Sequence, residues 1–214
     1  PLTGPVKVVG AEPGDVLAIE YLDIVPQPYG WSRVRPGIGF LRDLFPDPFL
    51  VHWDIKDGWA TSEQIPGVWI PQGAFMGTAG VAPSLAQIHL WSTREDEYSA
   101  RGGLVLLPEA TDAVPAEGPV ATDGLRTMPP RENGGNMDIK QLTKGSTLYL
   151  PVAVDGALFS TGDAHFAQGD SECCVTAIEM GASVTLRFSL LKGEAKEKSI
   201  TSPRFAHSGY FADP

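Results

Sequence analysis

The chain has 214 residues, of which 43% are hydrophobic and 20% charged, a composition typical of a globular protein with a buried core. Its formal net charge is −10, and its lysines and arginines form no basic cluster, which argues against nucleic acid or an anionic membrane as a partner. No apolar run reaches the roughly 18 to 20 residues that span a bilayer, and the first residues do not read as a signal peptide. We therefore expect a cytoplasmic protein that does not bind membranes.

The pattern of the chain predicts a mainly β fold. Glycine (24) and proline (19) separate short apolar runs, as in proteins with many strands and turns. Strands are predicted over 12–24, 145–154 and 182–191, the last of which alternates apolar and polar residues. We expect mixed or antiparallel sheets in a barrel-like or sandwich-like core, with long functional loops and few short helices.

Two further segments are predicted to complete a meander between residues 145 and 191. Residues 156–161 follow the hairpin dipeptide Asp155-Gly156, and residues 173–180 precede the last strand across Gly181. The polar stretch between these two segments would then be a connection between strands, where a rigid sheet can hold reactive side chains. Helices are expected only as short turns near 83–88.

Two segments rich in proline and glycine predict long excursions from the sheet. One is 102–137, which shows neither a helical nor a strand period. The other is 25–60, whose aromatic side chains either cover a cleft or pack against one another.

The stretch GDAHFAQGDSE (162–172) is the first candidate for chemistry. Asp163 and His165 are separated by one residue, so in an extended chain their side chains point to the same side and can bind one metal ion. Gln168, Asp170 and Glu172 follow closely. A solvated polar turn is the alternative interpretation of this stretch.

The stretch RENGGNMDIK (131–140) is the second candidate. It surrounds a double glycine with amides, acids and bases, a set that suits a substrate-binding loop. The polar residues are Arg131, Glu132, Asn133, Asn136, Asp138 and Lys140. A polar β-turn is the alternative interpretation.

Three blocks of the sequence resemble the acetamidase/formamidase family. They are PLTGPVKVVGAEPGDVLAIEYLDI at the start, IPGVWIPQGAFMGTAGVAPS over 65–84, and PPRENGGNMDIKQLTKGSTLYLPVAVDGALFSTGDAHFAQGDSECCVTAIEM over 129–180. The resemblance implies a mainly β homo-oligomer that hydrolyses short aliphatic amides and holds a divalent metal. Because members of that family are longer at both ends, residues 1–214 are expected to be one catalytic-core region, a fragment or processed chain whose missing terminal segments are separate chains or absent.

The resemblance also assigns residues to roles. Asn136 and Asp138 match the family's Gly-Gly-Asn-x-Asp block, and Asp163, His165, Gln168 and Glu172 match its Gly-Asp-x-His-x-x-Gln-Gly-Asp-x-Glu block; Ser171 departs from the more common glycine. We predict hydrolysis of formamide or acetamide by a metal-activated water. The predicted metal ligands are Asp163, His165 and Asp138, the catalytic acids and bases Glu132 and Glu172, and the substrate-binding residues Asn136 and Gln168. The expected metal is zinc, with calcium or magnesium as alternatives.

Two other hypotheses stay open at the level of the sequence. The first keeps the amidase activity but uses Cys173 or Cys174 as a nucleophile, with Glu179 or Lys140 nearby. The second is a non-catalytic, β-rich subunit that binds a small molecule or forms an oligomer.

Overall fold

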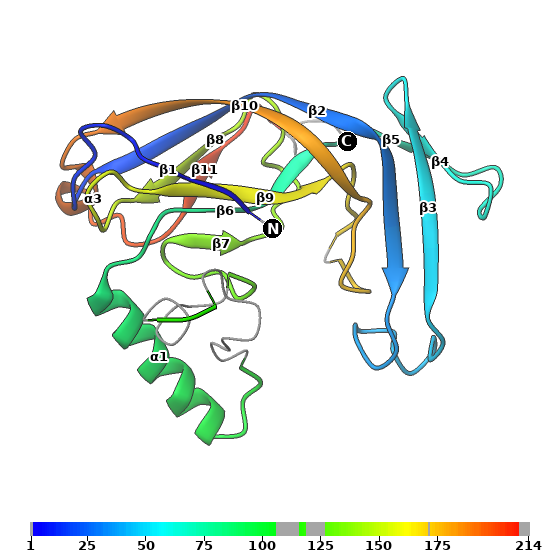
Figure 1. The fold of residues 1–214 in the computed structure, drawn as a ribbon, viewed down its shortest axis with the longest axis horizontal. Coiled ribbons are helices and arrows are strands. Elements are labelled where there is room, and N and C mark those ends of the chain that lie inside the picture. The colour runs from blue at the N-terminus through cyan, green and yellow to red at the C-terminus, as the bar shows by residue number, and fades with distance from the viewer. Residues whose placement is uncertain (1, 106–115, 119–126, 171, 210–214) are drawn as a thin grey trace.

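The strands of the protein form one antiparallel sheet in a computed structural model that describes residues 2–105, 116–118, 127–170 and 172–209 (Figure 1). Hydrogen-bonded neighbours follow the order β5-β4-β3-β2-β10-β9-β6-β7, while β1 pairs with β9, β8 with β2, and β11 with β8. The predicted mainly β fold with few helices is confirmed, although the sheet does not close into a barrel. The strands are β1 (Leu2–Val6), β2 (Val16–Val34), β3 (Phe49–Lys56), β4 (Trp59–Thr61), β5 (Trp69–Pro71), β6 (Phe75–Gly80), β7 (Gly134–Asn136), β8 (Thr147–Pro151), β9 (Phe159–His165), β10 (Glu179–Leu191) and β11 (Arg204–Ala206).

The long strand β2 links two parts of the molecule. Its first half pairs with β8 and β10, and its last residues pair with β3. Figure 1 shows β2 running along the top of the sheet and then turning down beside β3 at the right. We call residues 29–56 the arm, and we call the first half of β2 together with β1, β6 to β11 and the helices the body.

Each part has its own apolar core. In the body, alternate residues of β2, β8 and β10 face a core that includes Leu17, Leu148 and Phe159. In the arm, β3 buries every second residue, including Val51 and Trp53, against a smaller core. Phe166 and Ile178 belong to this smaller core, so the arm packs on the two ends of the segment that connects β9 to β10.

Helix α1 (Leu85–Ala100) is much longer than the short turn predicted near 83–88, so that prediction was wrong. A capping box begins the helix: the Ser84 hydroxyl accepts from the Gln87 backbone, and the Gln87 side chain accepts from the Ser84 backbone. The helix buries only Trp91 and Glu95, which explains why its sequence lacks a regular apolar period. A second helix, α3 (Glu194–Glu197), follows β10. No helix in the described part of the chain has the length and apolar character to cross a membrane.

The strand predictions succeed where alternation is regular and fail where pairing is distant. β10 keeps the predicted alternation, with Val184 and Phe188 toward the core and Thr185 exposed. The meander was wrong because β8 pairs with β2 and β11 rather than with β9, and residues 173–178 form a loop rather than a strand.

The two predicted excursions have different outcomes. Residues 25–60 are mostly strand rather than loop, because they form the end of β2, all of β3 and the start of β4. Of residues 102–137, positions 106–115 and 119–126 lie outside the described residues, and Gly134–Asn136 form β7.

Candidate functional site

Four neighbouring strands bring the polar side chains together. β10 pairs Glu179 with His165 of β9, and β9 in turn pairs with β6. β6 then pairs Thr78 with Asn136 of β7, after which the chain continues to Asp138. Residues that are as much as a hundred positions apart in the sequence therefore meet at one point of the sheet.

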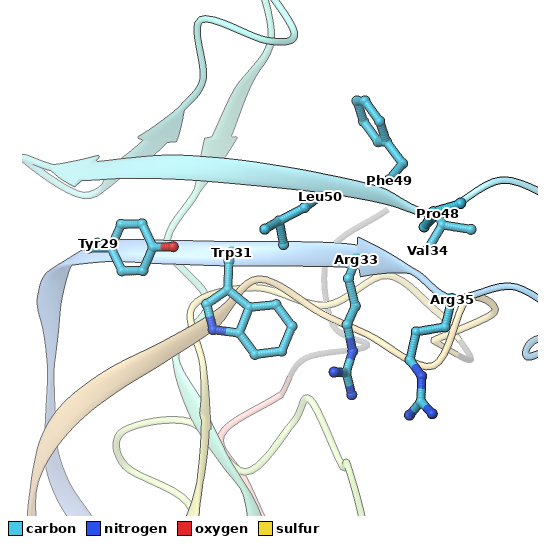
Figure 2. A pocket seen from close by; sticks show the side chains of 8 residues that line it. All are labelled: Tyr29, Trp31, Arg33, Val34, Arg35, Pro48, Phe49 and Leu50. Carbon is cyan, nitrogen blue, oxygen red and sulfur yellow. The ribbon is translucent and has the colours of Figure 1, made fainter.

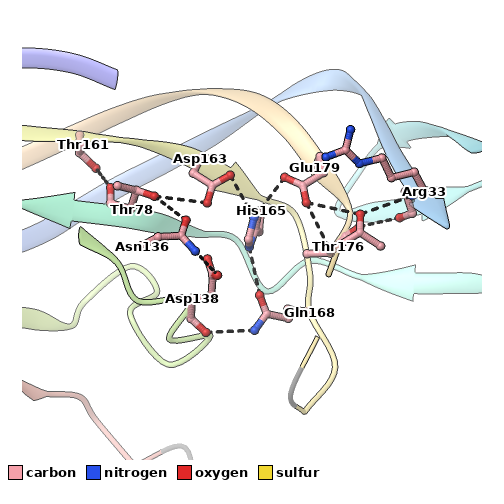
Figure 3. A network of polar contacts seen from close by, with 12 residues as sticks. Arg33, Thr78, Asn136, Asp138, Thr161, Asp163, His165, Gln168, Thr176 and Glu179 are labelled. Atoms are coloured by element: carbon pink, nitrogen blue, oxygen red, sulfur yellow. Dashed lines mark hydrogen bonds and ion pairs between the residues drawn. The ribbon is translucent and has the colours of Figure 1, made fainter. Parts of the chain in front are cut away.

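His165 is the centre of this arrangement and is only 1% exposed. Its Nε2 atom lies 3.4 Å from Asp163 Oδ1 and 3.2 Å from Glu179 Oε2. Its Nδ1 atom lies 3.1 Å from Gln168 Oε1 (Figure 3). The ring of Phe75 meets the imidazole edge to face, with the ring centres 5.0 Å apart. The predicted proximity of Asp163 and His165 is therefore confirmed.

A hydrogen-bonded chain of side chains continues from Asp163 to Asp138. The Thr78 hydroxyl lies 2.8 Å from Asn136 Oδ1 and 3.4 Å from Asp163 Oδ2. The Asn136 amide nitrogen donates to Asp138 Oδ2 at 2.6 Å, and the Gln168 amide nitrogen donates to the Asp138 carbonyl oxygen at 3.0 Å (Figure 3). The side-chain amides of Asn136 and Gln168 therefore both form hydrogen bonds with other residues of the cluster.

Gln168 fixes the orientation of the histidine. Because its amide nitrogen donates to the Asp138 carbonyl, its amide oxygen faces His165 and accepts a hydrogen bond from Nδ1–H. The Nε2 atom of His165 is left facing the carboxylates of Asp163 and Glu179. A neutral Nε2 lone pair beside two negative charges favours either a proton or a metal cation at this position.

Three acidic residues of the site have a left-handed backbone. The φ angles are 47° at Asp138, 59° at Asp163 and 46° at Glu172. This conformation is uncommon outside glycine, and such residues cluster at functional sites where the surrounding structure holds them in place. The backbone thus supports a functional role for these three acids independently of their charges.

The backbone of Gly77 leaves a gap between two of the carboxylates. A Cβ atom at Gly77 would lie 2.5 Å from Asp138 Oδ1 and 2.7 Å from Asp163 Oδ2. Asp138 Oδ1 is itself buried and has no hydrogen-bond partner among the described residues. Asp138, Asp163 and His165 each offer a ligand atom within 4.8 Å of the others, and so do His165, Glu172 and Glu179. The first set is the predicted set of metal ligands, and an unpaired buried oxygen beside a gap is the environment that a cation would satisfy.

The charges of the cluster shift the pKa values of its members in opposite directions. Burial acts to lower the pKa of His165, but Asp163 and Glu179 outweigh it and raise that pKa to about 10. The contact with His165 lowers the pKa of Asp163. Burial, together with the negative charges nearby, raises the pKa of Asp138 to about 6 and that of Glu172 to about 7. Carboxyl groups whose pKa values are raised toward 7 in this way are typical of sites that transfer protons.

The structure brings together six of the seven predicted site residues. Glu132 lies elsewhere in the contact network, because its carboxylate pairs with Arg94 of α1 at 2.6 Å, and this contact lowers its pKa. Glu179, by contrast, belongs to the cluster although it was not among the predicted site residues. The sequence suggested it only as a possible neighbour of a nucleophilic cysteine. The available signal was a single acid within the apolar run TAIEM, a position that in a strand places a charge among buried neighbours.

The two cysteines lie in the loop between β9 and β10. Cys173 is exposed and Cys174 half-buried. Burial and the neighbouring Cys173 raise the pKa of the Cys174 thiol, which favours the neutral form over the nucleophilic thiolate.

Two pockets of similar size lie near the arm. One, of about 580 Å³, is lined by the two strands of the arm, the residue after β2 and the residue before β3, and contains Trp31 with the Arg33 guanidinium 5.2 Å from its ring centre (Figure 2). The other, of about 560 Å³, lies between arm and body and includes Gln168 and Thr176. Of these two pockets, only the second has a wall residue, Gln168, whose side chain contacts His165 (Figure 3).

Residues 1–212 match the model of the acetamidase/formamidase family. The chain belongs to this family. The chain is also 40% identical to an acetamidase from Mycolicibacterium smegmatis over 94% of its length, and 36% identical to a formamidase from Methylophilus methylotrophus over 97% of its length.

Solved structures support the same relationship. A gamma lactamase from Delftia acidovorans superposes on 97% of this acetamidase/formamidase chain with a TM-score of 0.90 and 39% identity. The chain spans only about half the length of its relatives: 56% of the acetamidase, 55% of the formamidase and 55% of the lactamase. Its cytoplasmic location and its assembly into a homo-oligomer stay predictions.

Proposed function

We propose that this protein hydrolyses a short aliphatic amide, formamide or acetamide, to ammonia and the carboxylate. The observation that carries the proposal is the convergence of one buried histidine with four carboxylates, in a chain whose relatives include an acetamidase and a formamidase. An amide is a weak electrophile with a poor leaving group, so its hydrolysis needs both an activated water and a proton donor for nitrogen.

A divalent ion held by Asp138, Asp163 and His165 is part of the proposal. The unpaired Asp138 Oδ1 and the gap kept open by Gly77 support it, as does the Nε2 atom that faces carboxylates. A histidine with two carboxylates suits zinc better than calcium or magnesium, which prefer oxygen ligands alone. When bound, such an ion would lower the pKa of water and polarise the amide carbonyl.

Glu172 is the general base in this proposal. Its pKa of about 7 leaves a substantial fraction of carboxylate at neutral pH while keeping it basic enough to accept a proton. The carboxylate takes a proton from the attacking water as the water oxygen bonds to the amide carbon. The same proton then passes to the amide nitrogen, the C–N bond breaks, and ammonia leaves. Glu132, paired with Arg94, is a weaker candidate for this role.

Asn136 and Gln168 hold the cluster in shape in this proposal. The Asn136 amide joins Thr78 to Asp138, and the Gln168 amide joins His165 to the Asp138 backbone. Removing residues that fix the orientation of metal ligands in this way commonly lowers metal affinity by 10- to 100-fold.

Metal removal tests the proposal directly. The protein is treated with EDTA, its metal content is measured, and ammonia release from formamide and acetamide is followed before and after zinc is restored. We expect turnover to fall with metal content and to return with zinc. Unchanged turnover after verified metal removal would contradict the metal role.

The same assay separates the proposed activity from a binding role. If formamide, acetamide and propionamide release no ammonia while saturable ligand binding persists, the protein is a non-catalytic binding subunit. Iodoacetamide provides the test of a cysteine mechanism, because resistance of the active protein excludes Cys173 and Cys174 as nucleophiles. A five-membered lactam also belongs in the substrate panel, with the ring-opened amino acid as its readout, since the gamma lactamase structure superposes on this chain with a TM-score of 0.90.

A further inference from the structure

The pocket between the arm and the body has mainly apolar walls. It measures about 560 Å³ and is lined by apolar side chains of the arm, of β5 and of the segment between β9 and β10: Trp53, Ile70, Pro71, Ala167 and Ile178. Trp53 and Ile178 are both 6% exposed and belong to the apolar core of the arm. Packing in the core of the arm therefore fixes this part of the wall.

Two of the polar side chains in these walls, Ser32 and Lys140, already have partners. The Ser32 hydroxyl donates to the Ala177 carbonyl at 2.6 Å and accepts from the Trp53 indole at 3.0 Å. The Lys140 ammonium lies 2.6 Å from the Asp170 carboxylate. Since these groups bond within the protein, the pocket favours a hydrocarbon group over a strongly polar one.

Two wall residues connect the pocket to the polar cluster. Gln168 contacts His165 at 3.1 Å through its amide oxygen, and the Thr176 hydroxyl lies 3.4 Å from Glu179 Oε1 (Figure 3). A ligand in the pocket thus lies one side chain away from His165 and Glu179. This arrangement suits a substrate whose reactive group lies at the cluster while the rest of the molecule lies in the pocket.

The pocket is far larger than the smallest amides require. One water molecule occupies about 30 Å³ of liquid, and acetamide adds only a single methyl group to formamide, so either amide would fill a small part of the space. We propose that this pocket binds the hydrocarbon group of an amide substrate larger than acetamide, a branched aliphatic chain, while the amide group lies at the cluster. This inference rests on the proposed amidase function and names its substrate class.

Gly73 offers a way to fill the pocket without strain. It lines the pocket, a Cβ atom there would meet no other atom within 4 Å, and its φ is not in the left-handed region. The variant Gly73→Val therefore places two methyl groups in the space. Ser189→Val is the matched control, because it adds the same side chain on the exposed face of β10.

The test compares acetamide with isovaleramide and N-isobutylacetamide, which carry the branched chain on the acyl side and on the nitrogen. We expect the natural protein to prefer one branched amide over acetamide by roughly tenfold or more in kcat/KM. Gly73→Val should remove about tenfold from that amide and change acetamide by less than about twofold. The amide that loses activity identifies the side of the substrate that the pocket holds.

Saturation-transfer NMR supplies a readout that needs no turnover. We expect saturable transfer to the methyl groups of the preferred amide, weakened by Gly73→Val and unchanged by Ser189→Val. Acetamide hydrolysis with no selective effect of Gly73→Val on either branched amide overturns the inference and leaves the proposed function intact. No hydrolysis of any amide, with methyl binding still abolished by Gly73→Val, supports the hydrocarbon pocket and overturns the proposed function.

Discussion

The two pockets near the arm have nearly the same volume, about 580 and 560 Å³, but very different surroundings. The pocket on the arm itself contains aromatic rings and the exposed arginines Arg33 and Arg35 (Figure 2). The pocket between arm and body adjoins a buried histidine whose neighbours include acids with raised pKa values. Volume therefore does not distinguish the two pockets, whereas the titratable groups with shifted pKa values that converge beside the second one do.

The largest expected effect comes from comparing a histidine of the cluster with one of the arm. His165→Asn should lower kcat/KM for formamide by about 10³-fold or more, because it removes the group that contacts both Asp163 and Glu179. His52→Asn should change it by less than about twofold, since the His52 ring hydrogen-bonds to the exposed Tyr29 hydroxyl on the arm. Ammonia release measures both, with circular dichroism as a check of folding. Equal losses in the two variants would erase the distinction between the two regions.

A single methyl group tests the gap between the carboxylates. Gly77→Ala should lower kcat by about 10²-fold and weaken zinc binding by 10- to 100-fold, because the new Cβ displaces Asp138 and Asp163. Gly73→Ala is the matched control, because its Cβ would meet open space. Calorimetric zinc titration measures the affinity. Normal zinc binding by Gly77→Ala would show that the close approach of Asp138 and Asp163 to Gly77 is not needed for metal binding.

The pH dependence tests the role of Glu172. If its carboxylate is the base, kcat/KM should rise with pH through about 7 as the group loses its proton. Glu172→Gln should lower kcat/KM by about 10²-fold and remove this rise. An unchanged profile in Glu172→Gln would assign the base to another residue.

Stability in the absence of metal should follow the same pKa shift with a definite sign. The pKa of Glu172 is raised from 4.5 to about 7 in the folded protein, so its protonated form is favoured by folding. Its contribution to the free energy of unfolding is present below pH 4.5 and is lost as the pH rises through about 7. Urea titrations of the EDTA-treated protein should show this decline, and Glu172→Gln should reduce it. Asp138, with a pKa raised to about 6, acts in the same direction.

The smallest expected effect concerns Glu132. Its pair with Arg94 is exposed, with 52% of the arginine and 32% of the glutamate side chain accessible, so Glu132→Gln should cost at most about 1 kcal/mol in the free energy of unfolding. Its effect on kcat/KM should stay within about twofold. A loss as large as that of Glu172→Gln would restore Glu132 as a catalytic base and move the reaction toward α1.

The sequence predicted the features that depend on local spacing. The separation of Asp163 and His165 by one residue placed them together in a strand, and the alternation in 182–191 predicted the buried face of β10. Glu179 was missed because its position depends on the pairing of β9 with β10, which spacing along the chain does not reveal. Glu132 was assigned to the site because helix α1 was not predicted. Its ion pair with Arg94 of that helix joins residues 38 positions apart in the sequence. Gly77 gave no signal, since its importance comes from the absence of a side chain between two distant carboxylates.

The topology of the cluster also sets the order of events when the chain folds. The cluster forms only after four strands have paired: β6, β7, β9 and β10. Pairing strands that are distant in the sequence costs loop-closure entropy before the stabilising contacts form. The cluster should consequently be among the last parts of the protein to assemble. After dilution from urea, recovery of amide hydrolysis should lag behind recovery of β-sheet circular dichroism, so that zinc capture marks the completion of folding rather than its start.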